Sequence, residues 1–301
     1  MKYFFQIFFL SACLAVSAQS KKHVFESKTI QVEYRTKNGL LDGKYVSRYA
    51  NGKKKAEGNF KDNLRTGKWQ VWDTTGKMQE HVVAIDSGRR NTGGYFDYTF
   101  LKEADVAVEK EVWRNIFSEN NFLLFSLPSL FDTLYNAIQK EELHVYKDEE
   151  YVTARNKENI AGAFSAGKYD IASYKMKENW FFDKKTNAAC ARPTALYLIL
   201  KPHEAESEDN IGLGWIYFPE IRKVFARQKI RDKHFPWITT LDDLFWYGFF
   251  ASQIYKETNV YDRPIASYAK TPEAAALEAE RIELDMIEME HDIWLYGKSP
   301  F

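Results

Sequence analysis

Cysteine is scarce in this 301-residue sequence, which contains Cys13 and Cys190 and no other residue of this type. If an N-terminal leader containing Cys13 is removed, the single remaining cysteine excludes an intramolecular disulfide bond. Disulfides therefore cannot stabilise the fold, even in an oxidising compartment. Cys190 has no neighbouring motif, and we expect it to be a small buried apolar side chain rather than a reactive thiol.

Net charge is also lacking, since 42 lysine and arginine residues balance 42 aspartate and glutamate residues. A neutral chain has no overall attraction for a polyanion, so nucleic acid is not an expected partner. The motifs HExxH, GxSxG, CxxC, GxGxxG and the P-loop are absent. Glu290, His291 and Asp292 are consecutive helical residues that point to different sides, which favours solvated surface polarity over a metal site. We predict no enzyme, metal or cofactor.

A short apolar segment opens the chain. Lys2 is followed by YFFQIFFLSACLAVSA, which is too short for a comfortable membrane span and ends at the small-residue spacing that signal peptidases accept. We predict a signal peptide over residues 1–18, with cleavage after Ala18 and no direct membrane span. A rival interpretation is a lipoprotein signal, because Leu10–Cys13 has the form of a lipoprotein cleavage site that would leave Cys13 acylated.

One phrase of the sequence occurs twice, at a shift of about 24 residues. The matched positions are Gly43, Lys44, Tyr45, Gly52 and Lys53, then Gly67, Lys68, Trp69, Gly76 and Lys77. Each unit has alternating aromatic runs and Gly-containing turn sequences, which is typical of a β-hairpin. With the flanking segments, the two units predict a small meandering sheet over residues 23–85. We expect Tyr45, Trp69 and Trp72 to form its core.

The stretch NGKKKAEGNFKDNLRTGKWQVWDTTGK resembles the bacterial MORN-type repeat, a variant also found in antitoxin-like proteins. The resemblance covers about 60 residues and rests on glycine and aromatic positions that recur together. It implies a β scaffold that contacts other proteins, and membrane contact has been proposed for the related eukaryotic repeats. An antitoxin-like function is an alternative that requires residues 1–18 not to be a signal.

The composition changes after Ile85. Residues 86–105 are rich in Gly, Ser, Asn and Arg without helical spacing, which predicts a linker before a second domain at 106–301. In that domain, KEVWRNIF and SLPSLFDTLYNAIQKEELHVY are expected to be helical. ALYLIL and IGLGWIYF are expected to be strands. The acidic loop between them, Lys201–Asn210, lacks the ligand spacing of a calcium site and is interpreted as a hairpin tip.

Two long helices are expected to close the second domain. TTLDDLFWYGFFASQIYKE begins with Thr240 and Asp243 in capping-box spacing and is apolar on most sides. TPEAAALEAERIELDMIEMEHDIWLY has Thr271 as its cap and Pro272 in its first turn. It carries two apolar stripes, so one can face its own domain while the other faces something else. The stripes are Ala275, Ala279, Ile282, Met286, Met289, Ile293 and Tyr296, and Leu277, Leu284, Ile287 and Trp294.

The second domain contains, in order, several aromatic-rich blocks: Trp113-Arg114 with LFDTLYNAIQKEELHVY, then KMKENWFFDKKT, GWIYFPEIRKVFA, LDDLFWYGFFASQIYKETNVYDRPIASY and ALEAERIELDMIEMEHDIWLY. Taken in this order, the blocks resemble the gliding-motility and type IX secretion family GldN/PorN. The resemblance spans about residues 106–298, and the repeat module is not part of the family pattern. The sequence as a whole predicts an α+β protein, with an N-terminal β-meander of MORN-type hairpin repeats and a mixed α+β domain ending in two long helices.

The resemblance implies a non-enzymatic structural subunit of a periplasmic ring at the inner face of the outer membrane. The implied partners are a GldK/PorK-like outer-membrane lipoprotein, a GldM/PorM-like motor protein and further copies of the chain in the ring. We expect aromatic side chains to make these contacts, because exposed apolar patches mark interfaces. The candidates are Trp180, Phe181, Phe182, Trp246, Phe249, Tyr255, Tyr261 and Trp294. The alternative is a periplasmic adaptor that binds protein, or glycan through aromatic stacking.

Overall fold

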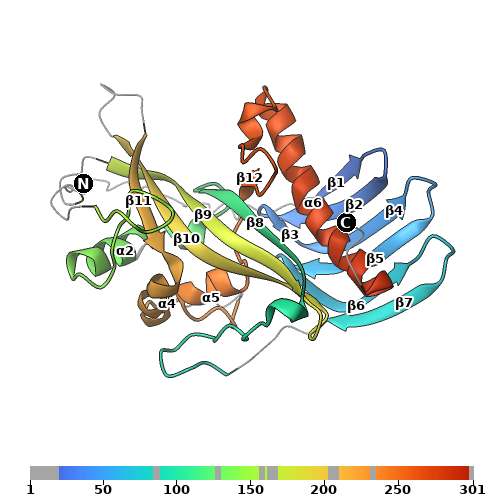
Figure 1. The fold of residues 1–301 in the computed structure, drawn as a ribbon, viewed down its shortest axis with the longest axis horizontal. Helices are drawn as coiled ribbons and strands as arrows, with labels where there is room; N and C mark the ends of the chain where they lie inside the picture. Colours follow the sequence, from blue (N-terminus) through green and yellow to red (C-terminus); the bar gives the residue numbers. More distant parts are fainter. Residues whose placement is uncertain are drawn as a thin grey trace, which may run out of the picture.

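The computed structural model describes residues 20–83, 89–125, 130–155, 160, 169–202, 210–230 and 235–297. It contains two antiparallel sheets, with a long C-terminal helix lying across one of them (Figure 1). The predicted signal peptide with Ala18, the rival site at Cys13 and most of the acidic loop Lys201–Asn210 lie outside the described residues. The mixed α+β class predicted from the sequence is confirmed.

The first sheet is the meander expected from the repeats. Its strands are β1 (Lys21–Glu26), β2 (Ile30–Lys37), β3 (Leu40–Leu41), β4 (Gly43–Tyr49), β5 (Lys54–Lys61), β6 (Leu64–Trp72) and β7 (Met78–Val83). Neighbours run antiparallel in the order β1-β2-β4-β5-β6-β7, with β3 paired to β2. Gly52 and Gly76 lie in equivalent tight turns with φ of 80° and 97°, a region that glycine enters without steric cost.

The aromatic positions of the repeat share one face of this sheet. Tyr45 and Trp69 are fully buried, and their ring centroids are 5.7 Å apart. Gly58 lies beneath Trp69, so close that a Cβ atom at Gly58 would stand 2.1 Å from Cδ2 of the indole. Trp72 belongs to the other face, where it is half-buried with the Lys54 ammonium 5.0 Å from its ring centroid. Trp72 is therefore not part of the buried core that was expected for it.

The second sheet has five strands in the order β11-β10-β9-β8-β12. The strands are β8 (Val106–Phe117), β9 (Tyr169–Asp183), β10 (Ala188–Pro202), β11 (Ile211–Tyr217) and β12 (Gln253–Glu257). The prediction that KEVWRNIF is helical is therefore wrong, because this segment forms the last eight of the twelve residues of β8. In a strand, successive side chains point to opposite faces of the sheet, so this segment packs on both faces at once.

Short helices cover one face of the second sheet. They are α1 (Phe122–Phe125), α2 (Leu130–Gln139), α4 (Phe218–Arg227) and α5 (Leu241–Trp246), beside the 3-10 turns η1 (Glu103–Asp105) and η2 (Ile265–Ser267). Phe218 and Phe225 of α4 and Leu244 of α5 share a buried cluster with Leu196 and Leu198 of β10. This cluster is the main hydrophobic core of the protein.

The prediction of a long helix that begins at Thr240 is wrong. The capping box forms, since the Thr240 hydroxyl accepts from the Asp243 amide at 3.3 Å, but α5 has six residues. Gly248 then adopts a positive φ of 60° and the chain returns to the sheet as β12. The aromatic density of this stretch reflects burial in the main core, and the second domain ends in one long helix instead of two.

That helix is α6 (Pro272–Tyr296), capped by Thr271 as predicted and closed by Gly297 at a φ of 68°. Ala279, Ile282 and Met286 of its first stripe are buried beside β8 and β12, whereas Ile293 of the same stripe joins the core of the first sheet. Its second stripe, with Leu284 and Trp294, shares a core with Tyr45 and Trp69 of the first sheet. The partner expected for the second stripe is thus the meander of the same chain.

Residues 89–102, part of the predicted linker, pack against α4 and α5. Phe96 is buried and its ring centroid lies 5.2 Å from that of Trp246. The Arg222 guanidinium stacks within 4.5 Å of the Tyr98 ring centroid while a bidentate pair with Asp242, at 2.8 and 2.9 Å, neutralises its charge. Cation–π and ionic contacts together hold this segment on the helices.

Candidate interaction surfaces

Most of the aromatic side chains predicted to contact partners are buried inside the chain. Tyr261 is the exception, being 75% exposed in the turn that follows β12. Trp246 and Tyr255 are half-buried. The buried members are Trp180, Phe181, Phe182, Phe249 and Trp294. The expectation that these five form exposed patches is wrong, because the two sheets and α6 use them as core.

A second group of residues, at the contact between α6 and the first sheet, also differs from the sequence prediction. Glu288 of α6 is buried and accepts a hydrogen bond from the Tyr45 hydroxyl at 2.7 Å. Lys55 of β5 reaches Glu288 at 3.1 Å and Asp292 at 2.8 Å. Acidic residues of α6 therefore meet a buried lysine of the meander.

Arg65 of β6 makes a second contact with the same turns of α6. Its Nε donates to Glu290 at 2.8 Å, Nη1 lies 2.8 Å from His291 Nε2, and Nη2 donates to the Ile287 carbonyl at 3.1 Å. The guanidinium also stacks 4.4 Å from the Trp69 ring centroid. His291 is completely buried, so the interpretation of residues 290–292 as solvated surface polarity is wrong.

The electrostatics of this contact follow from burial and from its close partners. Burial opposes the charge on Glu288, but the hydrogen bonds from His291 and Tyr45 and the charge of Lys55 outweigh it and hold the pKa of Glu288 well below its usual range. Burial lowers the pKa of His291, and the neighbouring Arg65 charge adds to the effect, although Glu288 opposes it. Because Arg65 can only donate, His291 Nε2 accepts and the imidazole is neutral.

Acidification is expected to weaken the protein through His291. The unfolded chain binds a proton near the ordinary pKa of 6.5, whereas the folded imidazole resists it, so full stability holds above pH 6.5 and declines as pH falls below it. The decline should reach at most about 1.4 kcal/mol per pH unit. Urea unfolding at pH values from about 5 to 8 measures it.

The control for this pH effect is His291→Gln, because the amide can still accept from Arg65 and donate to Glu288. Its free energy of unfolding should decline less steeply than that of the parent between pH 6.5 and the ordinary Glu288 pKa of 4.5, and the decline that remains comes from groups common to both proteins, such as His81, whose pKa burial also lowers. Equal pH dependence of variant and parent in that interval would contradict the assignment.

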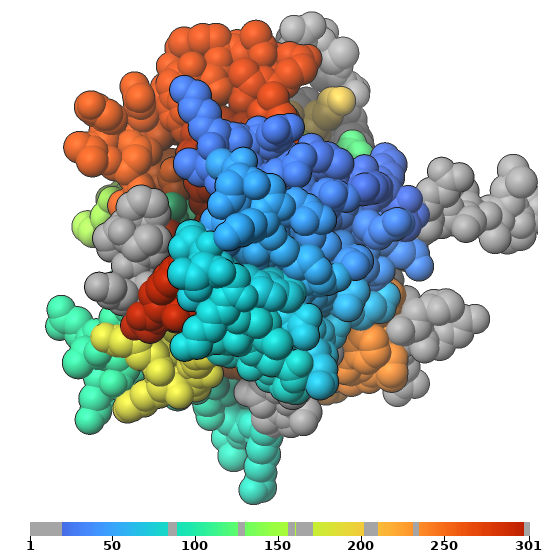
Figure 2. Space-filling view, turned by 90° about the vertical axis from the view of Figure 1, so that its right-hand side faces the viewer, coloured from blue at the N-terminus to red at the C-terminus, as the bar shows by residue number. Residues whose placement is uncertain are grey.

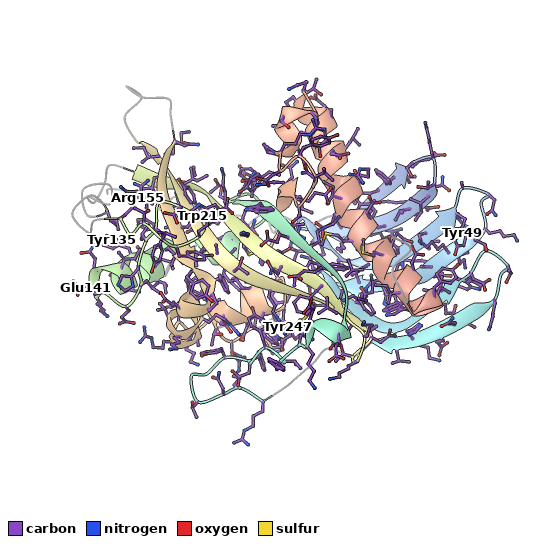
Figure 3. The ribbon with its side chains drawn as sticks, in the orientation of Figure 1. Tyr49, Tyr135, Glu141, Arg155, Trp215 and Tyr247 are labelled. Atoms are coloured by element: carbon purple, nitrogen blue, oxygen red, sulfur yellow. The ribbon has the colours of Figure 1, made fainter. Side chains whose placement is uncertain are left out.

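A third surface lies on the other face of the second sheet, and of its members the sequence analysis identified Tyr255 alone as an interaction candidate. We call it the aromatic–lysine face. Its members are Trp113, Lys175, Lys177, Tyr197, Trp215, Tyr255 and Lys256, from all five strands. Trp113 and Trp215 form a cluster of their own, which contains no helical residue among those described. Figure 3 marks Trp215 on β11, close to Arg155.

On the aromatic–lysine face, lysine ammonium groups lie against aromatic rings, and the rings contact one another. Lys256 lies 4.3 Å and Lys177 4.9 Å from the Trp113 ring centroid, and the Tyr197 and Trp215 rings meet edge to face at 4.9 Å. Cation–π attraction between each ammonium group and the neighbouring ring stabilises these contacts. Trp113 and Trp215 are themselves buried, with Tyr146 and Tyr151 packed against them, so Tyr197, Tyr255 and the lysines form the part of this face that a partner can contact.

Other site types find no support in the described part of the chain. No group of three or more His, Cys, Asp or Glu side chains there could hold a metal ion. Across the same residues, none of the helices has the length and apolarity that crossing a bilayer requires. Cys190 is half-buried, and burial raises the pKa of its thiol, which disfavours the reactive thiolate.

Comparison with known proteins places the second domain in a family. The family model described as gliding motility associated protein GldN matches residues 101–295, which include the second sheet and nearly all of α6. The first sheet lies outside the match, and the MORN-type name for it rests on resemblance alone. No curated protein matches the chain. Because the match covers well over half of its length, the chain belongs to the GldN family of gliding-motility and type IX secretion components.

Proposed function

We propose that this protein is a non-enzymatic structural subunit of a periplasmic ring in the type IX secretion and gliding machinery. It assembles with further copies of itself and with a GldK/PorK-like outer-membrane lipoprotein, and it contacts a GldM/PorM-like motor protein. The family match over residues 101–295 carries the proposal. A signal peptide that ends at Ala18 would deliver the chain to the periplasm.

The aromatic–lysine face supports an assembly function. Tryptophan and tyrosine are enriched where protein interfaces bury their centres, and rings fixed by their neighbours lose little entropy on binding. Tyr197 and Tyr255 are half-buried, so each keeps part of its ring available to a partner. We assign this face to the contact with the lipoprotein.

The first sheet acts in this proposal as an adaptor of fixed orientation. Its inner face is bonded to α6 through Lys55 and Arg65, so the meander and the second domain form one unit. Its other face is charged, with cross-strand pairs such as Lys22–Glu33 and Lys68–Glu80. Figure 2 shows the blue-to-cyan strands of the meander spread over one side of the molecule.

The decisive experiment is a tagged pull-down from cross-linked cell envelopes, followed by electron microscopy of the material that co-purifies. Rings that contain a GldK-like lipoprotein are the expected result. A monomer without that lipoprotein would contradict the proposal. Saturable binding of the purified protein to peptidoglycan fragments would instead favour the glycan-binding adaptor.

Removing two rings from the proposed contact should weaken partner binding without unfolding the protein. Tyr197→Ala with Tyr255→Ala is expected to lower lipoprotein recovery about tenfold or more, because truncated interface aromatics often cost over 1.4 kcal/mol. Phe100→Ala, which alters an exposed ring outside this face, is the matched control and should bind normally. Thermal unfolding of each variant checks the fold, and unchanged recovery with the double variant would overturn the assignment.

A further inference from the structure

The meander ends in two strand edges. Strands β1 and β7 are the terminal strands of the sheet path, as Figure 1 shows at the upper and lower margins of the blue-to-cyan sheet. Among the described residues, β1 has backbone pairing to β2 and β7 to β6, and each lacks a second neighbouring strand. A free edge has unpaired amide and carbonyl groups that can bind another strand.

Strand β1 has a charge pattern that is complementary to itself. Its outward-facing residues are Lys22, Val24 and Glu26, in that order, all exposed and on the face opposite the buried core. Val24 is 58% exposed. When two such strands run antiparallel with Val24 opposite Val24, each Lys22 meets Glu26 of the other copy. Opposite charges and apolar side chains directly across a strand pair are stabilising.

We infer that the β1 edge binds the β1 edge of a second copy of this chain, so that two meanders join into one continuous sheet. The contact is isologous, with a two-fold axis through the Val24 pair and perpendicular to the sheet. Lys22 already contacts Glu33 at 2.6 Å within its own chain, and Glu26 of the second copy would complete a network around that ammonium.

The other edge does not offer the same match. In β7 the outward-facing residues are Met78, Glu80 and Val82, and a symmetric pair would bring two Glu80 carboxylates together. Pairing of β1 with β7 provides a single ion pair, Lys22 with Glu80, where β1 with β1 provides two. Charge complementarity therefore selects β1 as the edge and a second copy as its occupant.

This contact is independent of the proposed function, because β1 lies outside residues 101–295 and a two-fold contact closes as a dimer. A single six-residue strand pair is a small interface, so the dimer should dissociate readily and form at high protein concentration. The ring experiment and the dimer experiment can therefore fail separately.

Cysteine cross-linking tests the geometry in the purified protein. Val24→Cys in a Cys13→Ser, Cys190→Ser background should give a disulfide-linked dimer on mild oxidation, since directly opposed Cβ atoms lie about 4.5–5.5 Å apart and a small shift brings them within the about 3.5–4.5 Å of a disulfide. Val82→Cys on β7 is the matched control, exposed and on an edge strand, and should stay monomeric. Equal cross-linking of both variants, or none with Val24→Cys, would overturn the proposal.

Charge reversal provides a second test that does not require new cysteines. Glu26→Lys alone should weaken the dimer about tenfold in sedimentation equilibrium, because it places two lysines opposite each other twice. Lys22→Glu combined with Glu26→Lys restores opposite signs and should recover association. A Glu26→Lys protein that associates like the parent would contradict the β1 contact, as would a double variant that stays monomeric while its fold is intact by circular dichroism.

Discussion

Glu288→Ala is expected to lower the free energy of unfolding by about 3–5 kcal/mol, because removing one partner of a buried ion pair leaves the other charge uncompensated. The substitution leaves Lys55 with Asp292 alone and removes the acceptor of the Tyr45 hydroxyl. Although burial alone would lower it, Glu288 and Asp292 raise the pKa of Lys55. Urea unfolding at neutral pH measures the loss directly.

The matched control for Glu288 is an acidic residue paired with lysine on the exposed face of the same sheet. Glu80 lies 3.0 Å from Lys68, and both side chains are exposed. Glu80→Ala should change the free energy of unfolding by about 0.5 kcal/mol or less, since solvent screens such pairs. If both substitutions lower the free energy of unfolding equally, the buried ion pair between Glu288 and Lys55 does not stabilise the contact between α6 and the meander.

Gly58→Ala is expected to destabilise the protein by about 3 kcal/mol, because a methyl group at this position overpacks the core of the meander. The new Cβ would stand 2.1 Å from Cδ2 and 2.4 Å from Cε2 of Trp69, which is wedged between Gly58 and His291. The indole is fully buried and has little room to move away. Thermal and urea unfolding report the cost.

Two further variants separate this steric effect from the conformational freedom of glycine. Gly76→Ala meets no atom within 4 Å, so it should cost only the strain of its positive φ, about 1 kcal/mol. Trp69→Phe makes room above Gly58, and the double variant with Gly58→Ala should lose less stability than the sum of the two single changes. Additive losses would show that Gly58 and Trp69 do not compete for the same space.

The features that could be predicted from sequence have local physical signals. The meander follows from glycines at fixed spacing between alternating strands, and α6 follows from Thr271, Pro272 and two apolar stripes. The sequence also indicated that the two stripes pack against different surfaces, although it did not identify the second surface. An apolar stripe indicates that its side chains are buried, but the residues that cover them come from elsewhere in the chain.

The features that could not be predicted depend on distant partners. Residues 290–292 look like a solvated charged run until Arg65, 225 positions earlier than Glu290, is placed against them. The aromatic–lysine face could not be predicted for the same reason, since each of the five strands contributes only one or two of its members. Aromatic density around Phe249 indicated that these side chains are covered, but density has no period, so it could show neither that the chain itself covers them nor that the helix ends at the turn around Gly248.

The position of α6 has a consequence for the order in which the chain can fold. The helix that covers Tyr45 and Trp69 is synthesised long after the meander, since Tyr45 precedes Glu288 by 243 positions. Contacts of such high sequence separation form slowly, so the aromatic face of the meander stays open to water until α6 has been synthesised and has folded. A nascent chain, or one shortened before α6, therefore exposes an aromatic surface that the folded protein buries, and such exposed surface promotes aggregation.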